Sequence, residues 1–450
     1  MKPQWLTFYR RVLVLYEGFV RKAGGVAIGS ALGQGIQFLA IPVLARIYTP
    51  SEFGQWAFLL GLLVILQPVL TLRYEMAIPL IKDEEAVGGL IVALVFILLM
   101  VVMVLGGSIC VLLRRLAIGH GVLKTILGGG DFAITGKIQI GLVLGLVVEG
   151  ITALFMFLAI RKRAFSSLGY FYFVRGLGTA LFQLLFGIMK LGALGLLMGW
   201  AGGQMVGWFL LWHDRAIREV FEVKDLAFWN PKVWGLLKKH RKFPYFMSPA
   251  GVLNTLGLRI PSLLLVFLYG TEVTGWYAMA VRLVDAPSNI ITSAMSQVYL
   301  GEASLIVRRS PEKLLPMFRQ ITRYMAALGV LVVPLLIGAS QLVSFLLGKE
   351  WAPVGAFILV LLPYLVVKLI VSPISLSSVV AQRQELQFLF DGGRVLLTFA
   401  VMVVGYGVHL PAVVIIAGYS FTMAILYSVY YLFYLHLAKR VSATVSYEHQ

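Results

Sequence analysis

The chain has 450 residues, of which 60% are apolar and only 13% charged, about half the charged share of an average soluble domain. With a mean hydropathy of +0.89, it has too little polar surface to face water, so the composition excludes a soluble protein and predicts a polytopic membrane protein. The formal charge of +18 favours anionic lipid headgroups or an anionic substrate over nucleic acid. The single cysteine excludes a disulfide framework and a thiolate metal site.

Apolar segments of about 17 residues or more, long enough to cross a bilayer, recur along the whole chain. None of them alternates apolar and polar residues as a strand would, so we expect an all-α fold. The twelve expected spans lie near residues 24–46, 53–72, 86–112, 138–160, 167–189, 191–212, 246–269, 274–305, 321–347, 352–378, 386–407 and 411–436.

The segments outside these spans indicate two six-helix halves. Residues 1–23 contain no small-residue cleavage site, so they predict an interfacial helix and not a removed signal peptide. The N-terminal half covers 24–212 and the C-terminal half 246–436. The basic, Trp-containing linker at 213–245 between them is expected to lie on the membrane surface, and residues 437–450 form a tail.

The distribution of Lys and Arg predicts the orientation in the membrane. The two termini and the loops after even-numbered spans hold 26 of these residues, whereas the opposite side holds 7. Because cytoplasmic loops carry the positive excess, both termini, the linker and the tail are expected in the cytoplasm.

A weak internal repeat supports the two halves. Tyr48 and Gly54 correspond to Tyr269 and Gly275 at the same offset of 221 residues, which relates the first two spans to spans seven and eight. Both copies would begin in the cytoplasm, so the repeat is expected to be parallel.

Several stretches distributed over most of the chain resemble the oligosaccharide flippase family, which belongs to the superfamily that also contains multidrug and toxin extruders. The likeness is carried by Gly33-Gln34, by LARIYTPSEFG at 44–54, by LRYEMAIPL at 72–80, by FPY at 243–245 with NTL at 254–256, by GWYAMAVR at 275–282, and by Ser375-Leu376 ahead of QRQ at 382–384.

The resemblance implies two six-helix halves around a central cationic cavity lined by spans one, two, seven and eight. It also implies a function: moving an undecaprenyl-diphosphate-linked oligosaccharide from the cytoplasmic to the periplasmic leaflet of a bacterial inner membrane. The family supplies O-antigen, exopolysaccharide or capsule assembly, and it works by alternating access driven by an ion gradient. The partners would be this lipid-linked sugar, membrane lipids and a polysaccharide polymerase or other assembly proteins, with no cofactor beyond a coupled Na⁺ or H⁺.

Four arginines on the expected cavity helices are candidates for binding a diphosphate, because guanidinium stays charged and presents a planar fork that matches phosphate oxygens. These are Arg46, Arg73, Arg259 and Arg282. An ionisable group at membrane depth costs about 3 kcal/mol on insertion scales, which makes each a functional hypothesis. For Arg46 and Arg73, which lie near span ends, snorkelling to headgroups is an equal alternative.

Two carboxylates are candidates for coupling to the ion. Asp285 follows Arg282 by three residues on one helix face, where the two charges can neutralise each other or respond to a proton or cation. Glu75 lies just past the cytoplasmic end of span two, where an acid is more often simply solvated.

Two further pairs are expected to be structural. Glu149 in span four and Arg175 in span five lie at similar depths, so a contact between them would compensate both charges. Asp391 and Arg394 in span eleven repeat the three-residue spacing outside the expected cavity helices. Lys368 stands alone in span ten and predicts no specific role.

Two other functions remain as alternatives. A multidrug and toxin extruder of the same superfamily would favour intramembrane carboxylates over arginines, because its substrates are cations. A membrane glycan polymerase would need a sizeable outer loop for catalytic groups, and the longest outer loop, 113–137, holds one acid, Asp131. The sequence therefore favours a transporter without catalytic residues or a metal site.

Overall fold

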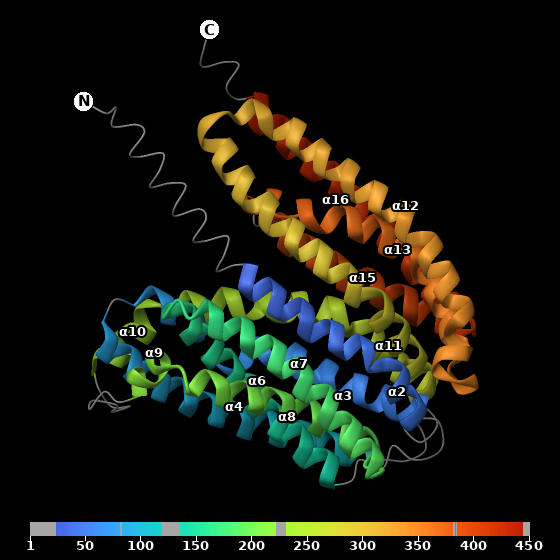
Figure 1. The fold of residues 1–450 in the computed structure, drawn as a ribbon, viewed down its shortest axis with the longest axis horizontal. Coiled ribbons are helices and arrows are strands. Elements are labelled where there is room, and N and C mark those ends of the chain that lie inside the picture. Colours follow the sequence, from blue (N-terminus) through green and yellow to red (C-terminus); the bar gives the residue numbers. More distant parts are fainter. Residues whose placement is uncertain are drawn as a thin grey trace. The chain divides into compact units, whose positions relative to one another are not determined.

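The computed structural model describes residues 24–81, 83–118, 136–221, 231–380, 383 and 385–443. Every regular element in this part of the chain is a helix, which confirms the all-α prediction (Figure 1). The described residues group into two compact units. The first unit falls within Met1–Ala40, Leu66–Leu113 and Thr135–Pro249, and the second within Ile41–Ile65, Arg114–Ile134 and Ala250–Gln450.

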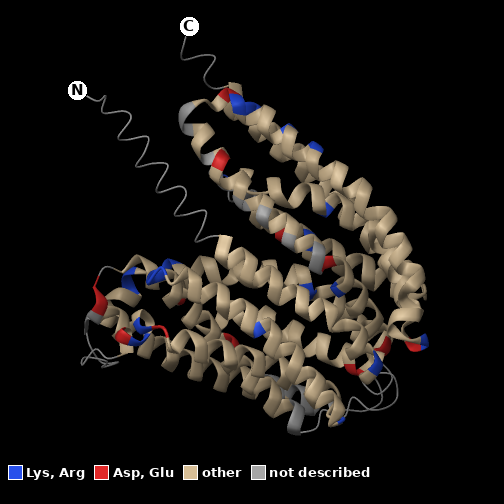
Figure 2. Cartoon of the chain, viewed as in Figure 1, with Lys and Arg blue, Asp and Glu red and all other residues tan. Residues whose placement is uncertain are grey.

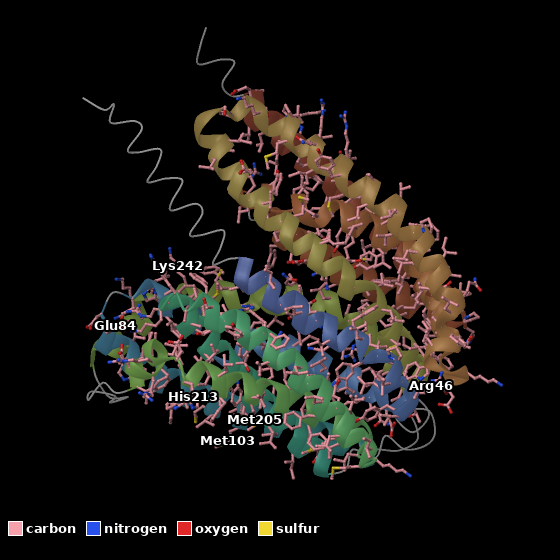
Figure 3. The ribbon with its side chains drawn as sticks, viewed as in Figure 1. Arg46, Glu84, Met103, Met205, His213 and Lys242 are labelled. Carbon is pink, nitrogen blue, oxygen red and sulfur yellow. The ribbon has the colours of Figure 1, made fainter. Side chains whose placement is uncertain are left out.

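The first unit begins with a helix over residues 24–39. It continues with η1 (Tyr74–Leu80), α4 (Glu84–Ile118), α6 (Gly136–Arg161), α7 (Phe165–Ile188), α8 (Gly192–Trp212), α9 (Arg215–Arg218), η2 (Glu219–Phe221), α10 (Pro231–Lys239) and η3 (Phe243–Met247). Large apolar side chains such as Met103 and Met205 point away from this unit, as expected of helix faces in contact with lipid (Figure 3).

Glycines determine how closely the helices of the first unit pack. A Cβ atom on Gly199 or Gly203 of α8 would lie 2.6 Å from a backbone nitrogen of α7, at Gln183 and Thr179 respectively. The helix over 24–39 packs against α7 in the same way, because a Cβ on Gly176 would lie 2.5 Å from the Cα of Gly33. Helices approach this closely in membranes only where the side chains are small.

The short amphipathic helix α10 lies in the linker expected on the membrane surface. Its Val233 and Leu237 are buried, and the backbone carbonyl of Leu237 accepts a 3.1 Å hydrogen bond from the hydroxyl of Tyr74. Trp234 and Lys238 are exposed on the other side of this helix. This arrangement suits a helix that packs on the protein with one face and meets lipid headgroups with the other.

The second unit holds the remaining elements. They are α2 (Ile41–Ile47), the part of α3 (Pro50–Leu70) up to Ile65, α11 (Ser248–Arg309), η4 (Pro311–Lys313), α12 (Leu314–Leu347), η5 (Lys349–Trp351), α13 (Pro353–Ile374), α14 (Ser377–Val380), α15 (Glu385–Gly407) and α16 (Ala412–Ala443). Gly270 interrupts α11 with φ 86° and ψ 178°, a conformation that favours glycine.

Eleven helices of the described residues are long and apolar enough to cross a membrane. One of them, Phe243–Asp285, contains the break at Gly270 and extends over the expected spans seven and eight. The structure is therefore consistent with twelve spans, and the protein is a multi-pass membrane protein. The expected interfacial helix at 1–23 and most of the loop at 113–137 lie outside the described residues, and helix α16 continues to Ala443, into the expected tail.

The repeated glycines of the two halves meet each other. A Cβ on Gly54 of α3 would lie 2.9 Å from the backbone nitrogen of Gly275 in α11, and a Cβ on Gly275 would lie 3.2 Å from the nitrogen of Gly54. Next to them, Trp351 is buried, lies 5.2 Å from the ring of Phe53, and donates a 2.8 Å hydrogen bond to the carbonyl of Ala45. These contacts place residues 41–65 in the second unit, whereas the sequence assigned them to the N-terminal half.

Candidate functional site

A cavity of about 520 Å³ lies inside the second unit. Its walls come from α11, α13, α15 and α16, with Val64 of α3 at one side. Helices α13, α15 and α16 and the part of α11 up to Asp285 are long and apolar enough to cross a membrane, and Figure 2 shows few charged residues away from the helix ends. A polar lining is therefore unusual for a cavity between such helices.

The lining is polar and aromatic. It carries three cationic side chains, Arg259, Lys368 and Arg394, and one carboxylate, Asp285. Hydroxyl and amide groups come from Ser262, Asn289, Thr292, Ser293, Ser296, Ser372, Ser375 and Gln387, and aromatic rings from Tyr277, Tyr364, Phe390, Tyr419, Tyr427, Tyr430 and Tyr434.

An ion pair crosses the cavity from α13 to α11. Lys368 Nζ lies 2.8 Å from Asp285 Oδ1, and the two side chains are 16% and 26% exposed. The Lys368 ammonium also lies 5.5 Å from the ring centre of Tyr364. The three-residue spacing suggested Arg282 as the partner of Asp285, but the ion-pair partner is Lys368. Lys368 comes from α13, and spacing along one helix cannot reveal a partner on another helix.

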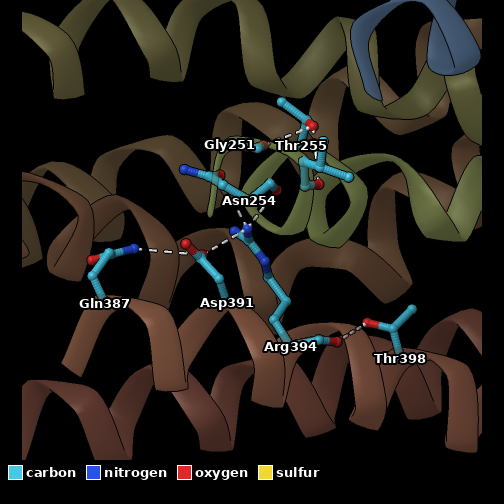
Figure 4. A network of polar contacts seen from close by, with 8 residues as sticks. Gly251, Asn254, Thr255, Gln387, Asp391, Arg394 and Thr398 are labelled. Carbon is cyan, nitrogen blue, oxygen red and sulfur yellow. Dashed lines mark hydrogen bonds and ion pairs between the residues drawn. The ribbon is translucent and has the colours of Figure 1, made fainter. Parts of the chain in front are cut away.

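The expected pair Asp391 and Arg394 also belongs to this region (Figure 4). Arg394 Nη2 lies 3.0 Å from Asp391 Oδ1, and the side chains are only 5% and 6% exposed. The same nitrogen donates to the backbone carbonyl of Asn254 at 2.8 Å and to its side-chain Oδ1 at 3.2 Å, which connects α15 to α11. Arg394 lines this cavity of the second unit, whereas the sequence placed the pair outside the helices expected to line a central cavity.

The two arginines expected on spans seven and eight occupy different surroundings. Arg259 lines the cavity. Arg282 is not among the lining residues, and its guanidinium lies 5.4 Å from the ring centre of Trp56. Arg282 Nη1 and Trp56 Nε1 are both buried, and neither finds a hydrogen-bond acceptor among the described residues. Buried donors without acceptors are costly, so this pair of groups is suited to receive an anionic oxygen.

Arg46, at the end of α2, has a local partner. Its Nη2 donates a 2.9 Å hydrogen bond to the carbonyl of Phe345 near the end of α12, and Figure 3 labels Arg46. A cation here also faces the negative end of the α12 helix dipole. These contacts explain Arg46 as a residue that joins two helix ends.

Arg73 and Glu75 lie together in the first unit, after the end of α3. Arg73 has φ 60°, and its Nη1 lies 3.7 Å from Glu75 Oε1. Glu75 is fully buried and accepts a hydrogen bond from the hydroxyl of Thr71, so it is not the solvated acid that its position at a span end favoured. Burial raises the pKa of Glu75 above its ordinary value, although Thr71 and Arg73 counteract part of this effect.

Glu149 and Arg175, the pair expected between spans four and five, interact electrostatically in the first unit. The guanidinium of Arg175 lies over two rings of its own helix, 4.9 Å from the centre of Tyr172 and 5.5 Å from that of Phe171. Stacking on aromatic faces therefore adds to the stabilisation of this buried cation.

Comparison with known proteins identifies the family. The family described as "Polysaccharide biosynthesis protein" matches residues 43–356, which is more than half of the chain. The chain belongs to this family. No curated protein matches it.

Solved structures show the fold of this family member. The lipid II flippase MurJ in an inward closed conformation matches with a TM-score of 0.66 and 13% identity over 94% of this chain and 90% of that one. A transporter of the MOP superfamily from Pyrococcus furiosus, whose binding pocket is described as reversed in polarity, matches with a TM-score of 0.59 and 14% identity over 94% of this chain and 96% of that one. An inward-facing multidrug resistance transporter of the MATE family matches with a TM-score of 0.57 and 13% identity over 93% of this chain and 96% of that one. The family member has the fold of MOP transporters.

Proposed function

We propose that the protein is a flippase that moves undecaprenyl-diphosphate-linked oligosaccharide units from the cytoplasmic to the periplasmic leaflet of a bacterial inner membrane, with both termini in the cytoplasm. The observation that carries this proposal is the polar, predominantly cationic cavity within membrane-spanning helices of a polysaccharide biosynthesis family member. A lipid-linked sugar diphosphate needs such a hydrophilic passage for its head, since hydrocarbon offers neither hydrogen bonds nor counter-charges. The likeness in fold to a lipid II flippase supports the same substrate class.

The diphosphate is assigned to Arg259 and Arg282. Arg259 presents its cation from the cavity wall, and Arg282 offers the buried donor that lacks an acceptor. The geometry supports Arg46 and Arg73 less, because Arg46 holds a helix end and Arg73 pairs with Glu75. A cationic drug is the less suitable cargo, since the cavity lining carries more cations than carboxylates.

Coupling to an ion gradient is assigned to Asp285, with Glu75 as the second candidate. The position that a metal cation would take beside Asp285 is held by Lys368 Nζ at 2.8 Å. A proton needs no such position, so the ion pair supports H⁺ over Na⁺ at this carboxylate. Alternating access would then combine substrate binding with a change in the Lys368–Asp285 contact.

Deletion of the gene tests the proposal. We expect lipid-linked oligosaccharide to accumulate in the inner leaflet and polysaccharide to be lost. Complementation with Arg259→Ala or Arg282→Ala should fail at normal expression, Arg→Lys should restore transport partly because it keeps the charge and loses the fork, and Arg323→Ala, at an exposed arginine of α12, should restore it fully. Absence of accumulation, or full complementation by both alanine variants, would contradict the proposal.

A further inference from the structure

The two long walls of the cavity have different chemistry. On α11, Asp285, Asn289, Thr292, Ser293 and Ser296 recur at spacings of three and four residues, which places them on one helix face. On α16, four tyrosines line the cavity at spacings of eight, three and four residues: Tyr419, Tyr427, Tyr430 and Tyr434. One wall thus offers hydrogen-bonding groups, whereas the other offers aromatic rings.

This combination suits a sugar better than it suits water alone or an apolar molecule. A pyranose ring has C–H faces that pack on aromatic rings, whose faces carry negative charge density, and hydroxyl groups around its edge that pair with hydroxyl and amide side chains. The cavity volume of about 520 Å³ lies within the range of roughly 300–1,000 Å³ typical of small-molecule sites.

The charges of the lining further define the ligand. Lys368 stands between Asp285 on α11 and the ring of Tyr364 on α13, and part of its side chain remains accessible. Arg259 adds a second cation to the same cavity, and Arg394, which also lines it, is already paired with Asp391. An incoming carboxylate can therefore replace Asp285 at the ammonium group, whereas a cationic ligand would meet Arg259, Lys368 and a carboxylate already in contact with Lys368.

We propose that this cavity binds an acidic sugar residue, such as a hexuronate, of the transported glycan. The sugar carboxylate would take the place of Asp285 at Lys368 Nζ, its ring would lie on the tyrosines of α16, and its hydroxyl groups would pair with the polar face of α11. This inference rests on the proposed function for the origin of the sugar, and it adds a glycan site in the second unit to the arginines assigned to the diphosphate.

Binding of free monosaccharides to the purified full-length protein in lipid nanodiscs tests the inference. Saturation-transfer difference NMR with D-glucuronate, D-glucose and acetate, together with competition by inorganic phosphate against glucuronate, separates the contributions of the carboxylate, the ring and bare charge. We expect glucuronate to bind, with transfer strongest to its ring protons. Glucose and acetate should each bind at least about tenfold more weakly, because each lacks either the charge-assisted contact or the stacking surface.

Two substitutions at the ion pair have opposite expected effects. Lys368→Gln removes the cation and should weaken glucuronate binding by about tenfold or more. Asp285→Asn removes the competing carboxylate and should tighten it by about threefold, the amount that a partly exposed ion pair typically contributes. Lys349→Gln, at an exposed lysine of η5, is the matched control and should bind as the wild type does.

Opposite signs at one ion pair keep the test independent of folding defects, because a merely damaged protein would lose affinity with both variants. Equal binding of acetate and glucuronate, full displacement of glucuronate by an equal concentration of phosphate, or weaker binding to Asp285→Asn would overturn the inference. None of these outcomes bears on accumulation of lipid-linked oligosaccharide in the deletion strain, so the glycan site and the flippase function fail separately.

Discussion

The two units differ in what fills the space between their helices. In the first unit, glycines bring α7 and α8 to backbone contact, and the helix over 24–39 meets α7 in the same way. In the second unit, α3 and α11 also meet at glycines, but tyrosines and charged groups of α11, α13, α15 and α16 line a cavity. Close packing leaves no room for a ligand, whereas a polar cavity in a membrane must hold one or hold water. The difference supports placing the proposed glycan site in the second unit.

The largest effect on stability is expected at the buried ion pair of Asp391 and Arg394 in the second unit. Arg394→Met leaves the carboxylate of Asp391 buried without its cation and removes the donor to the Asn254 carbonyl. Breaking such a pair from one side costs about 3–5 kcal/mol, so folded yield and the unfolding temperature in detergent should both fall sharply.

A double variant tests whether the charge itself is required. Asp391→Leu combined with Arg394→Met removes both charges, and it should recover part of the lost stability because no charge is left uncompensated. If Arg394→Met alone unfolds at the wild-type temperature, the pair does not hold α15 against α11.

A smaller effect is expected from one methyl group in the first unit. Gly203→Ala places a Cβ 2.6 Å from the backbone nitrogen of Thr179 and 2.7 Å from the carbonyl of Arg175, so α7 and α8 must separate. Overpacking of this kind costs about 1–3 kcal/mol. The loss should be visible as a lower unfolding temperature in a thermal shift assay.

The matched substitution in the second unit should be tolerated. A Cβ on Gly393 of α15 would find its nearest neighbour, a methyl group of Leu426, at 3.9 Å, which is ordinary contact. Gly393→Ala should therefore leave stability unchanged or raise it slightly through its better helix propensity. Equal losses at Gly203 and Gly393 would remove the distinction between the tight contact of α8 with α7 and the open surroundings of Gly393 in α15.

Much of the fold follows from sequence pattern. Apolar length gives the helices, and the repeat that pairs Gly54 with Gly275 identifies two glycines that turn out to contact each other. Spacing along a single helix also predicts Asp391 beside Arg394. The break in α11 at Gly270 agrees with the expected boundary between spans seven and eight. Glycine adopts the positive φ of this break without steric cost.

The site was only partly predictable, because it depends on which helices face each other. Lys368 gave no signal beyond being a lone cation in an apolar run, and its partner Asp285 is 83 residues away in the sequence. The tyrosines of α16 are ordinary core residues in the sequence, and only their approach to α11 and α13 makes them a wall of a cavity. Burial of Glu75 likewise depends on tertiary packing around the turn that follows α3.

The smallest effect concerns this buried carboxylate of the first unit. Burial raises the pKa of Glu75 above its ordinary value of 4.5, and the Thr71 hydroxyl and Arg73 lower it only in part. The folded protein therefore holds this proton more tightly than the unfolded chain, so the stability that Glu75 contributes is lost as the pH rises through its folded pKa. Glu75→Gln should raise the unfolding temperature at pH 7 by about 1–3 °C and flatten its dependence on pH between 5 and 7.

Glu84, at the start of α4, provides a control of opposite sign in the same unit. Its limited burial raises the pKa, but Lys162 at 2.9 Å and Arg161 at 3.3 Å outweigh burial and lower it below 4.5. The folded protein then binds this proton less tightly, so the stabilisation is present above pH 4.5 and is lost as the pH falls through the folded pKa. Glu84→Gln should slightly lower the unfolding temperature at pH 7, and this change should be small because the side chain is half exposed and screened by water.

A lower unfolding temperature for Glu75→Gln at pH 7 would show that the contacts of Glu75 with Thr71 and Arg73 outweigh burial. The first unit would then hold a stabilising buried charge, as the second unit does.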